Sequence, residues 1–506
     1  MRSITPSSLV FGKPGRNAAK ALLCCSMLLG TALPTAQAHK NKHWNKHREP
    51  AADAPTFDNP LVEQRADPWV FRHTDGYYYM MATVPEYDRL ELRRAETIQG
   101  LGEASAETIW NAHPSGIMAT HIWAPELHRV NGAWYVYFAA GSSSNIWDIR
   151  IYVLENTSEN PLEGEWVEKG EMQGVDDFGI SEKFALDATT FELRGKQYLI
   201  WAQKDHRDNW DSNLYIAEME NPWTLKTPQV MLTSPEYDWE IVRFHVNEGA
   251  SVLKRNGRLF VTFSASGTGP EYRVGLLTAK QSSDPLDPAS WEKSVQPVFH
   301  SVDFNSQWGT GHNSFTTTPD GTDVIIYHSR NYEGIIGDPL TDTNRGMRAK
   351  IFTWNRDGSP NFGLPPADGT TGPLFSGLSD LCVAVEKDSF VPGADVQQDK
   401  CKVKDAQMWT LHPDGTGYYE IKAGHNGQCL DMAWDSTLNG GNAIQWPCNG
   451  SASQQWTADM VDDSQFMLIN RNSGKCLDVW ELSTEPGGTL KQWDCTAGAG
   501  QLWSRR

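Results

Sequence analysis

The sequence has no excess of positive charge. Its 506 residues include 44 lysines and arginines against 63 aspartates and glutamates, which gives a formal net charge of −19. A chain without a basic field has little attraction for phosphate backbones or anionic lipid surfaces. We therefore expect neither nucleic acid nor a membrane as a partner, and a neutral ligand fits this charge better.

Long apolar runs are also scarce, and the one that stands out lies at the N-terminus. Basic residues precede the apolar stretch 21–33, and the small-residue motif Ala-Gln-Ala follows at 36–38. This order predicts a cleaved secretory signal over residues 1–38 and a secreted chain, extracellular or periplasmic. Residues 39–54, rich in Lys, His and Arg, are expected to be a disordered leader. No other run approaches the roughly 18–20 apolar residues that cross a bilayer.

Cysteine is absent between residues 26 and 381, and six cysteines follow. An even number in an oxidising compartment favours disulfides over metal or redox chemistry. Successive pairs are 19 residues apart and recur every 47 residues, and a Gln-x-Trp motif recurs at the same interval, so three copies of one unit are predicted. The cysteines are at 382, 401, 429, 448, 476 and 495, and the motif tryptophans are Trp409, Trp456 and Trp503.

These repeats resemble the ricin-type β-trefoil lectin family over residues 375–506. One lobe cannot bury its apolar face alone, so three lobes are expected to stack with the repeated tryptophans in a shared core. The resemblance implies one disulfide in each lobe. The three expected pairs are Cys382–Cys401, Cys429–Cys448 and Cys476–Cys495.

Sugar binding in that family uses an Asp after the first Cys of a lobe and an aromatic residue two positions before the second. Lobe two offers Asp431 with Trp446, and lobe three offers Asp478 with Trp493. Lobe one has neither residue type and is expected to be scaffold. The Asn that the family carries before Gln-x-Trp is missing from lobes two and three, so a purely structural trefoil stays an alternative.

The longer N-terminal part of the chain shows a looser repeat. A glycine turn followed by a run of β-forming residues recurs five times, at spacings of 56 to 64 residues, which predicts five all-β units. The turn glycines are Gly76, Gly132, Gly195, Gly257 and Gly321. The predicted fold is therefore all-β: a five-bladed β-propeller over residues 55–365, a linker over 366–374, and the trefoil.

The start of the strand before each turn should face the propeller axis. Counting back eight or nine residues from each glycine gives Asp67, Trp123, Asp187, Glu248 and His312. Burying three carboxylates together is costly unless chemistry or partners require it. The axis is therefore the candidate functional site.

The residues at these positions resemble the motifs of glycoside hydrolase family 43. The motifs are Arg-Ala-Asp-Pro at 65–68, Trp-Ala-Pro-Glu at 123–126, Leu-Asp-Ala at 186–188, Asn-Glu-Gly-Ala at 247–250 and Gly-Thr-Gly-His at 309–312. The resemblance implies an inverting glycosidase in which Asp67 is the general base and Glu248 the general acid. Asp187 is expected to orient Glu248 and, through its charge, to raise the pKa of that acid.

Further residues are expected around this centre. Trp123 is predicted to stack on the sugar, with packing between blades as the alternative. His328 and Arg330 follow the fifth β-run and are expected to reach the pocket as substrate contacts. The family resemblance implies that His312 helps to hold a hydrated cation, commonly calcium, with a satisfied buried histidine as the alternative. The hydrolysis itself is expected to need no cofactor.

Within family 43 the sequence most resembles α-L-arabinofuranosidases that act on arabinan or arabinoxylan of plant cell walls. A β-xylosidase or an endo-arabinanase stays open, because a pocket for either pentose needs a few hydroxyl contacts and one aromatic wall. A non-catalytic lectin with two sugar-binding modules is the alternative from another class. The presence of all three carboxylates argues against it. The trefoil is expected to tether the enzyme to the polysaccharide.

Overall fold

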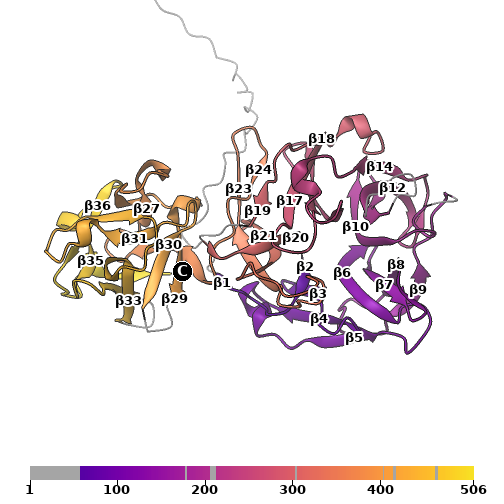
Figure 1. Ribbon diagram of the computed structural model, residues 1–506, viewed down its shortest axis with the longest axis horizontal. Coiled ribbons are helices and arrows are strands. Elements are labelled where there is room, and N and C mark those ends of the chain that lie inside the picture. Colours follow the sequence, from indigo (N-terminus) through magenta and orange to yellow (C-terminus); the bar gives the residue numbers. More distant parts are fainter. Residues whose placement is uncertain are drawn as a thin grey trace, which may run out of the picture. The chain divides into compact units, whose positions relative to one another are not determined.

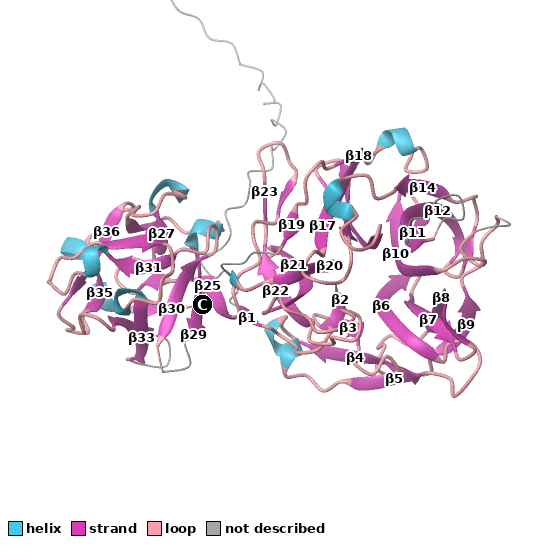
Figure 2. Cartoon of the chain, viewed as in Figure 1, coloured by secondary structure: helices cyan, strands magenta, loops and turns pink. Residues whose placement is uncertain are grey.

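A computed structural model describes residues 57–505, except 177–178, 205–211, 302–304, 403, 414–417 and 462–464. The predicted signal sequence (1–38) and leader (39–54) lie outside the described residues. Figure 2 shows strands joined by loops, with only short helices. The all-β class predicted from the sequence is therefore confirmed.

Five antiparallel sheets follow one another between residues 66 and 351 and form the five blades (Figure 1). Blades one and two contain β2 (Ala66–Arg72), β3 (Tyr78–Thr83), β4 (Arg89–Ala95), β5 (Glu107–Asn111), β6 (Thr120–Val130), β7 (Ala133–Ser142), β8 (Asn145–Asn156) and β9 (Val167–Glu171). Blades three and four contain β10 (Ala185–Leu193), β11 (Lys196–Gln203), β12 (Asn213–Asn221), β13 (Thr224–Leu225), β14 (Val230–Thr233), β15 (Asn247–Arg255), β16 (Arg258–Ala265), β17 (Arg273–Lys280), β18 (Glu292–Lys293) and β19 (Phe299–His300). Blade five contains β20 (Trp308–Thr317), β21 (Asp323–Arg330) and β22 (Gly346–Ile351), and β23 (Thr353–Trp354) and β24 (Pro360–Asn361) follow it. The short helices of this part are η1 (Gln99–Gly102), η2 (Asp238–Glu240) and η3 (Pro288–Ser290).

The first and last blades meet and close the ring. Val62, which precedes β2, pairs with Met347 of β22. The hydroxyl of Ser314 in β20 donates a hydrogen bond to the carbonyl of Pro68 in β2 at 2.8 Å. Closure of this kind protects the short edges of the inner strands and fixes where these strands start around the axis.

The innermost strand of every blade has a β-bulge near its start. The register with the second strand shifts there, and every blade has within this shift a residue with a positive φ of 43° to 57°, while β6 has a second one, His121. A bulge bends the strand and re-aims its side chains, which here turns them towards the axis. The five residues are Asp67, Ala124, Asp187, Gly249 and His312.

The C-terminal part is a trefoil of three lobes around a common apolar core. Its strands are β26 (Phe375–Ser376), β27 (Cys382–Val385), β28 (Val396–Asp399), β29 (Met408–Pro413), β30 (Tyr419–Ala423), β31 (Cys429–Met432), β32 (Ala443–Trp446), β33 (Gln455–Met460), β34 (Gln465–Asn470), β35 (Cys476–Val479), β36 (Gly488–Trp493) and β37 (Trp503–Ser504). Its short helices are η5 (Glu386–Asp388), η6 (Asp405–Gln407), η7 (Ala433–Asp435), η8 (Ala452–Gln454), η9 (Trp480–Leu482) and η10 (Ala499–Gln501). Residues 366–374, predicted to be a linker, include β25 (Gly369–Pro373), which pairs with β1 (Phe57–Asn59) and with β29.

The three repeated tryptophans lie at equivalent places in the trefoil core. Trp409, Trp456 and Trp503 are fully buried. Each indole donates to the carbonyl of the residue after the first cysteine of its own lobe, at 3.0, 3.0 and 3.3 Å. The structure also contains the three disulfides within lobes, Cys382–Cys401, Cys429–Cys448 and Cys476–Cys495.

We expect Trp456→Ala to lower the free energy of unfolding of the trefoil by about 3–5 kcal/mol, because it removes a large buried side chain and leaves a cavity. Trp434→Ala is the matched control, since Trp434 is 99% exposed and its loss should change stability little. Denaturant unfolding of the full chain measures both. Equal midpoints for the two variants would contradict the structural role of Trp456.

Candidate active site

All five predicted axis residues line one cavity. Its volume is about 550 Å³, and the five are Asp67, Trp123, Asp187, Glu248 and His312. Asp67, Asp187 and His312 are buried, whereas Trp123 and Glu248 are partly exposed. The bulges of five different strands thus bring together three carboxyl groups, one imidazole and one indole.

The groups around Asp67 keep its carboxylate ionised. The Thr83 hydroxyl donates to Oδ2 at 2.6 Å, while the Arg345 guanidinium and His312 Nδ1 lie 3.3 and 3.1 Å from Oδ1. Burial alone would raise the pKa of Asp67. The charges of His312 and Arg345 outweigh burial and hold that pKa well below its usual range. Asp67 can therefore accept a proton but holds none at rest.

Glu248 and Asp187 are in the opposite state. Burial raises the pKa of Glu248, and burial together with the charge of Glu248 raises the pKa of Asp187 to about 8. The Tyr272 hydroxyl donates to Glu248 Oε1 at 2.7 Å, and the Gly249 amide donates to Asp187 Oδ2 at 3.0 Å. Burial and nearby negative charge thus favour the protonated forms of Glu248 and Asp187. The cavity therefore combines one ionised carboxylate with two carboxyl groups whose pKa values are raised.

His312 lies between these groups. Its Nδ1 is 3.1 Å from Asp67 Oδ1 and 4.0 Å from Asp187 Oδ2. Burial alone would lower the pKa of His312, but the two carboxylates outweigh it and raise that pKa to about 10. At neutral pH the ring is therefore a cation that stabilises the ionised Asp67.

The hydrated cation implied at the axis stays a prediction: His312 Nδ1 is engaged with Asp67 Oδ1 at 3.1 Å, so this nitrogen would meet a cation through water and not as a direct ligand. A protonated imidazole has no lone pair to donate, and Asp67 is already engaged with Thr83, Arg345 and His312. Calcium takes six to eight oxygen ligands. In the described part of the chain, the group of three ligand-type side chains found together is Glu420, Cys429 and Cys448, and its cysteines form a disulfide. No step of the chemistry is assigned to a cation.

His328 and Arg330 lie behind the cavity wall, and neither side chain lines the cavity within the described ranges. No more than 1% of the surface of either residue is exposed. His328 Nδ1 accepts a hydrogen bond from the Asp67 amide at 3.0 Å, and burial lowers the pKa of His328 well below its usual value. Arg330 donates to the carbonyls of Thr268, Pro339 and Asp342. The structure therefore places both side chains as supports of Asp67 and of the loops at the cavity mouth, and their contact with substrate stays a prediction.

The sequence reasoning missed three residues at this centre: Thr83, Tyr272 and Arg345. Arg345 is separated from Asp67 by 278 residues and precedes β22. Tyr272 precedes β17, and its ring is stacked on that of His328 with centroids 5.7 Å apart. One signal for Tyr272 exists in the sequence: Gly311 is a glycine because a Cβ there would lie 2.5 Å from the Tyr272 ring.

We expect Tyr272→Phe to move the alkaline limb of the pH profile of kcat to higher pH. The Tyr272 hydroxyl donates to Glu248 and thereby favours the ionised form of that carboxyl group. Without the donor the pKa of Glu248 rises, so the acid keeps its proton further into the alkaline range. The loss of one hydrogen bond should lower kcat by up to about tenfold. An unchanged or acid-shifted alkaline limb would contradict this role.

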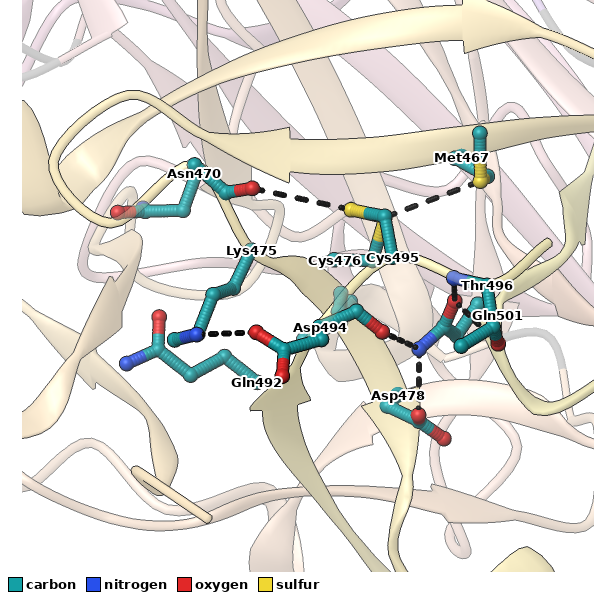
Figure 3. The surroundings of a disulfide bond; sticks show 12 residues. Met467, Asn470, Lys475, Cys476, Asp478, Gln492, Asp494, Cys495, Thr496 and Gln501 are labelled. Carbon is teal, nitrogen blue, oxygen red and sulfur yellow. Dashed lines mark hydrogen bonds and ion pairs between the residues drawn. A yellow bond between two sulfur atoms is a disulfide. The ribbon is translucent and has the colours of Figure 1, made fainter. Parts of the chain in front are cut away.

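In the trefoil, the two tryptophans predicted to bind sugar are exposed, whereas the two predicted aspartates are buried or half-buried. Asp431 is buried and accepts from Gln454 Nε2 at 2.8 Å, and in lobe three Asp478 accepts from Gln501 Nε2 at 2.7 Å (Figure 3). Trp446 and Trp493 are 42% and 38% exposed, respectively. Lobes two and three thus each have an exposed indole and an acid that is held by the first Gln of the Gln-x-Trp motif.

The geometry and the sequence agree on one class of protein. A family model described as glycosyl hydrolases family 43 matches residues 57–360, and a ricin-type β-trefoil lectin domain-like model matches 366–446, 405–493 and 452–505. The chain belongs to glycosyl hydrolase family 43 and is a glycoside hydrolase with a lectin-like trefoil domain.

Particular relatives are similar over the propeller. An extracellular exo-α-(1→5)-L-arabinofuranosidase of Streptomyces avermitilis is 52% identical over 328 residues, which cover 65% of this chain and 67% of the relative. An enzyme of the same description from Streptomyces chartreusis is 53% identical over 284 residues, covering 56% of this chain and 85% of the relative. The crystal structure of an α-L-arabinofuranosidase from Lactobacillus brevis matches with a TM-score of 0.59 and 51% identity, covering 62% of this chain and 98% of the other.

Proposed function

We propose that the protein is a secreted, exo-acting α-L-arabinofuranosidase that removes arabinose from arabinan or arabinoxylan with inversion. The observation that carries the proposal is the single cavity lined by Asp67, Glu248 and Asp187, in which the pKa of Asp67 is lowered and the pKa values of the other two are raised. Inverting glycosidases need such a base and acid in one site. The proposal that the released sugar is arabinose rests on similarity to enzymes described as arabinofuranosidases.

In the proposed reaction, Asp67 removes a proton from a water molecule as that water attacks the anomeric carbon. Glu248 gives its proton to the leaving glycosidic oxygen. Burial and the charge of Asp67 keep the pKa of Glu248 raised until the sugar binds, while Asp187, whose own pKa is raised by burial and by Glu248, helps to orient the acid. Protonated His312 and Arg345 keep Asp67 ionised. Water and two carboxyl groups complete the reaction without a cofactor.

One experiment tests the sugar and the stereochemistry. The mature chain is incubated with arabinoxylan, debranched arabinan and the nitrophenyl glycosides of α-L-arabinofuranose and β-D-xylopyranose. Free arabinose, seen first by NMR as the β-anomer, supports the proposal. Xylose alone would indicate a β-xylosidase, oligosaccharides an endo-arabinanase, and no product a lectin.

The location of the protein is proposed from its relatives and its N-terminal sequence. Two of the relatives are described as extracellular. Along the described stretches of the chain, no helix is long and apolar enough to cross a bilayer. Detection of the mature chain, beginning near residue 39, in the culture medium would support secretion.

The trefoil is proposed to hold the enzyme on the polysaccharide through Trp446 and Trp493. We expect the double variant Trp446→Ala, Trp493→Ala to bind insoluble arabinan or arabinoxylan about tenfold more weakly, because each substitution removes an exposed aromatic face. Pull-down assays should use the full chain carrying Glu248→Gln, so that the polysaccharide is not digested. Met460→Ala, at another exposed apolar position of the trefoil, is the control. Equal retention of all three proteins would indicate a purely structural trefoil.

A further inference from the structure

A buried ion pair lies beside the strand that carries Glu248. Lys293 Nζ in β18 lies 2.6 Å from Glu240 Oε1 and 2.9 Å from Glu240 Oε2. The Glu240 side chain has no exposed surface, and that of Lys293 is 11% exposed. An apolar pair of similar size in such a place often stabilises a fold as well or better, so the stability of the blade alone does not account for these two charges.

The Glu240 carboxylate gathers donors from three segments of blade four. Its Oε2 accepts the amides of Glu236 and Tyr237 at 2.7 and 2.8 Å, and its Oε1 accepts Asn247 Nδ2 at 3.1 Å. Lys293 adds a donor from β18. The two amide contacts fix η2, and the Asn247 contact fixes the start of β15. A carboxylate with all of these partners holds the three segments in one arrangement.

Asn247 directly precedes Glu248, and the regular pairing of β15 stops at this point. The register with β16 holds at Asn247 and Glu248 and is then lost until Ser251, so the bulge interrupts the ladder directly after Glu248. Asn247 is fully buried, its amide donates to the Ser212 carbonyl at 3.0 Å, and its side chain donates to Glu240. The position of the Glu248 backbone therefore depends on what holds Asn247.

The Glu248 carboxyl group is itself held by few contacts. Among the described residues, Tyr272 is the one side chain that donates a hydrogen bond to it, at 2.7 Å on Oε1. The last torsion of a glutamate side chain has a broad minimum, so the backbone from which the side chain extends largely sets where its proton lies. A displacement of about 1 Å between reacting groups can lower a rate by about 100-fold.

We propose that Glu240, paired with Lys293, is a positioning residue for the general acid. Through Asn247 it holds the start of β15, so that the Glu248 carboxyl group meets the glycosidic oxygen of the bound sugar. The inference rests on the proposed function, since it assigns a support to the acid of that reaction. Glu240 is not among the described residues that line the cavity, and it acts on the chemistry through Asn247 and the strand.

The test compares α-1,5-L-arabinotriose, whose leaving group needs a proton, with α-L-arabinofuranosyl fluoride, whose leaving group departs without one. Glu240→Gln keeps the size of the side chain but has one acceptor oxygen in place of two. It is expected to lower kcat on the trisaccharide by about 10–100-fold and to change KM and the rate on the fluoride by less than about twofold. Glu292→Gln, the same substitution at the exposed neighbour of Lys293 in β18, should change neither rate.

Further variants test the link and the ion pair separately. Asn247→Ala removes the contact between Glu240 and β15 but leaves the ion pair, and it should show the same selective loss on the trisaccharide. If both residues act on Glu248 through one path, the double variant Glu240→Gln, Asn247→Ala should lose no more than the larger single loss. Lys293→Met should reproduce the selective loss, and Lys293→Arg, which keeps the charge, should recover part of the activity.

Three results would overturn the positioning role: equal losses of Glu240→Gln on both substrates, an Asn247→Ala variant as active as wild type on the trisaccharide, and additive losses in the double variant. If Glu240→Gln does not fold, the two substrates are compared with Asn247→Ala, which leaves the ion pair in place. The proposed function fails separately, by the wild-type chain cleaving neither substrate.

Discussion

Glu248→Gln is expected to lower kcat on α-1,5-linked arabino-oligosaccharides by about 10²–10⁴-fold, and to leave most of the activity on α-L-arabinofuranosyl fluoride. A glutamine keeps the shape of the side chain but has no proton to give to a glycosidic oxygen. Fluoride is a good leaving group and departs without a proton donor. The difference between the two substrates therefore isolates the acid step from binding and from attack by water.

Two controls make this result specific. Glu192→Gln makes the same substitution at an exposed position of β10 and should change neither rate. Equal thermal unfolding of wild type and Glu248→Gln shows that the variant is folded. Parallel losses on oligosaccharide and fluoride in a folded Glu248→Gln variant would remove Glu248 from the role of general acid.

The β-bulges explain why repeat counting along the sequence located the centre so well. Five turn glycines mark the ends of five inner strands, so the start of each strand could be found by counting back. The count was eight residues in blade three and nine in the other four, and in every blade it led to the bulge or to the residue just before it. In blade four the residue with positive φ is Gly249, one position after Glu248, whereas in blades one and three it is the carboxylate itself.

The charges that set the state of the acids could not be found in this way. Arg345 and Tyr272 lie in segments that precede third strands, outside the repeated turn and its register. Their partners Asp67 and Glu248 are brought to them by ring closure and by the β16–β17 connection, which no local pattern encodes. For the same reason the sequence placed His328 and Arg330 near the centre but not on the correct side of its wall.

Asp67→Asn is expected to lower kcat by about 10²–10⁴-fold on the oligosaccharide and on the fluoride alike, because both reactions need a base that activates water. This distinguishes Asp67 from Glu248, whose loss should spare the fluoride. Asp287→Asn, on an exposed turn where asparagine can also cap η3, is the matched control. An Asp67→Asn variant that still hydrolyses the fluoride would contradict the assignment of the base.

Asp67→Asn should also lower the stability of the folded protein, by an amount that depends on pH. Asp67 neutralises the buried cations His312 and Arg345, and removal of one partner from such a group costs about 3–5 kcal/mol. In the wild type the pKa of His312 is raised from 6.5 to about 10, so its contribution to stability is complete below pH 6.5 and is lost as pH rises through 10. Asp67→Asn removes the main cause of that shift. The deficit in melting temperature should therefore be largest at acidic to neutral pH and should narrow towards pH 10, whereas a deficit independent of pH would mean that His312 is not charged in the folded enzyme.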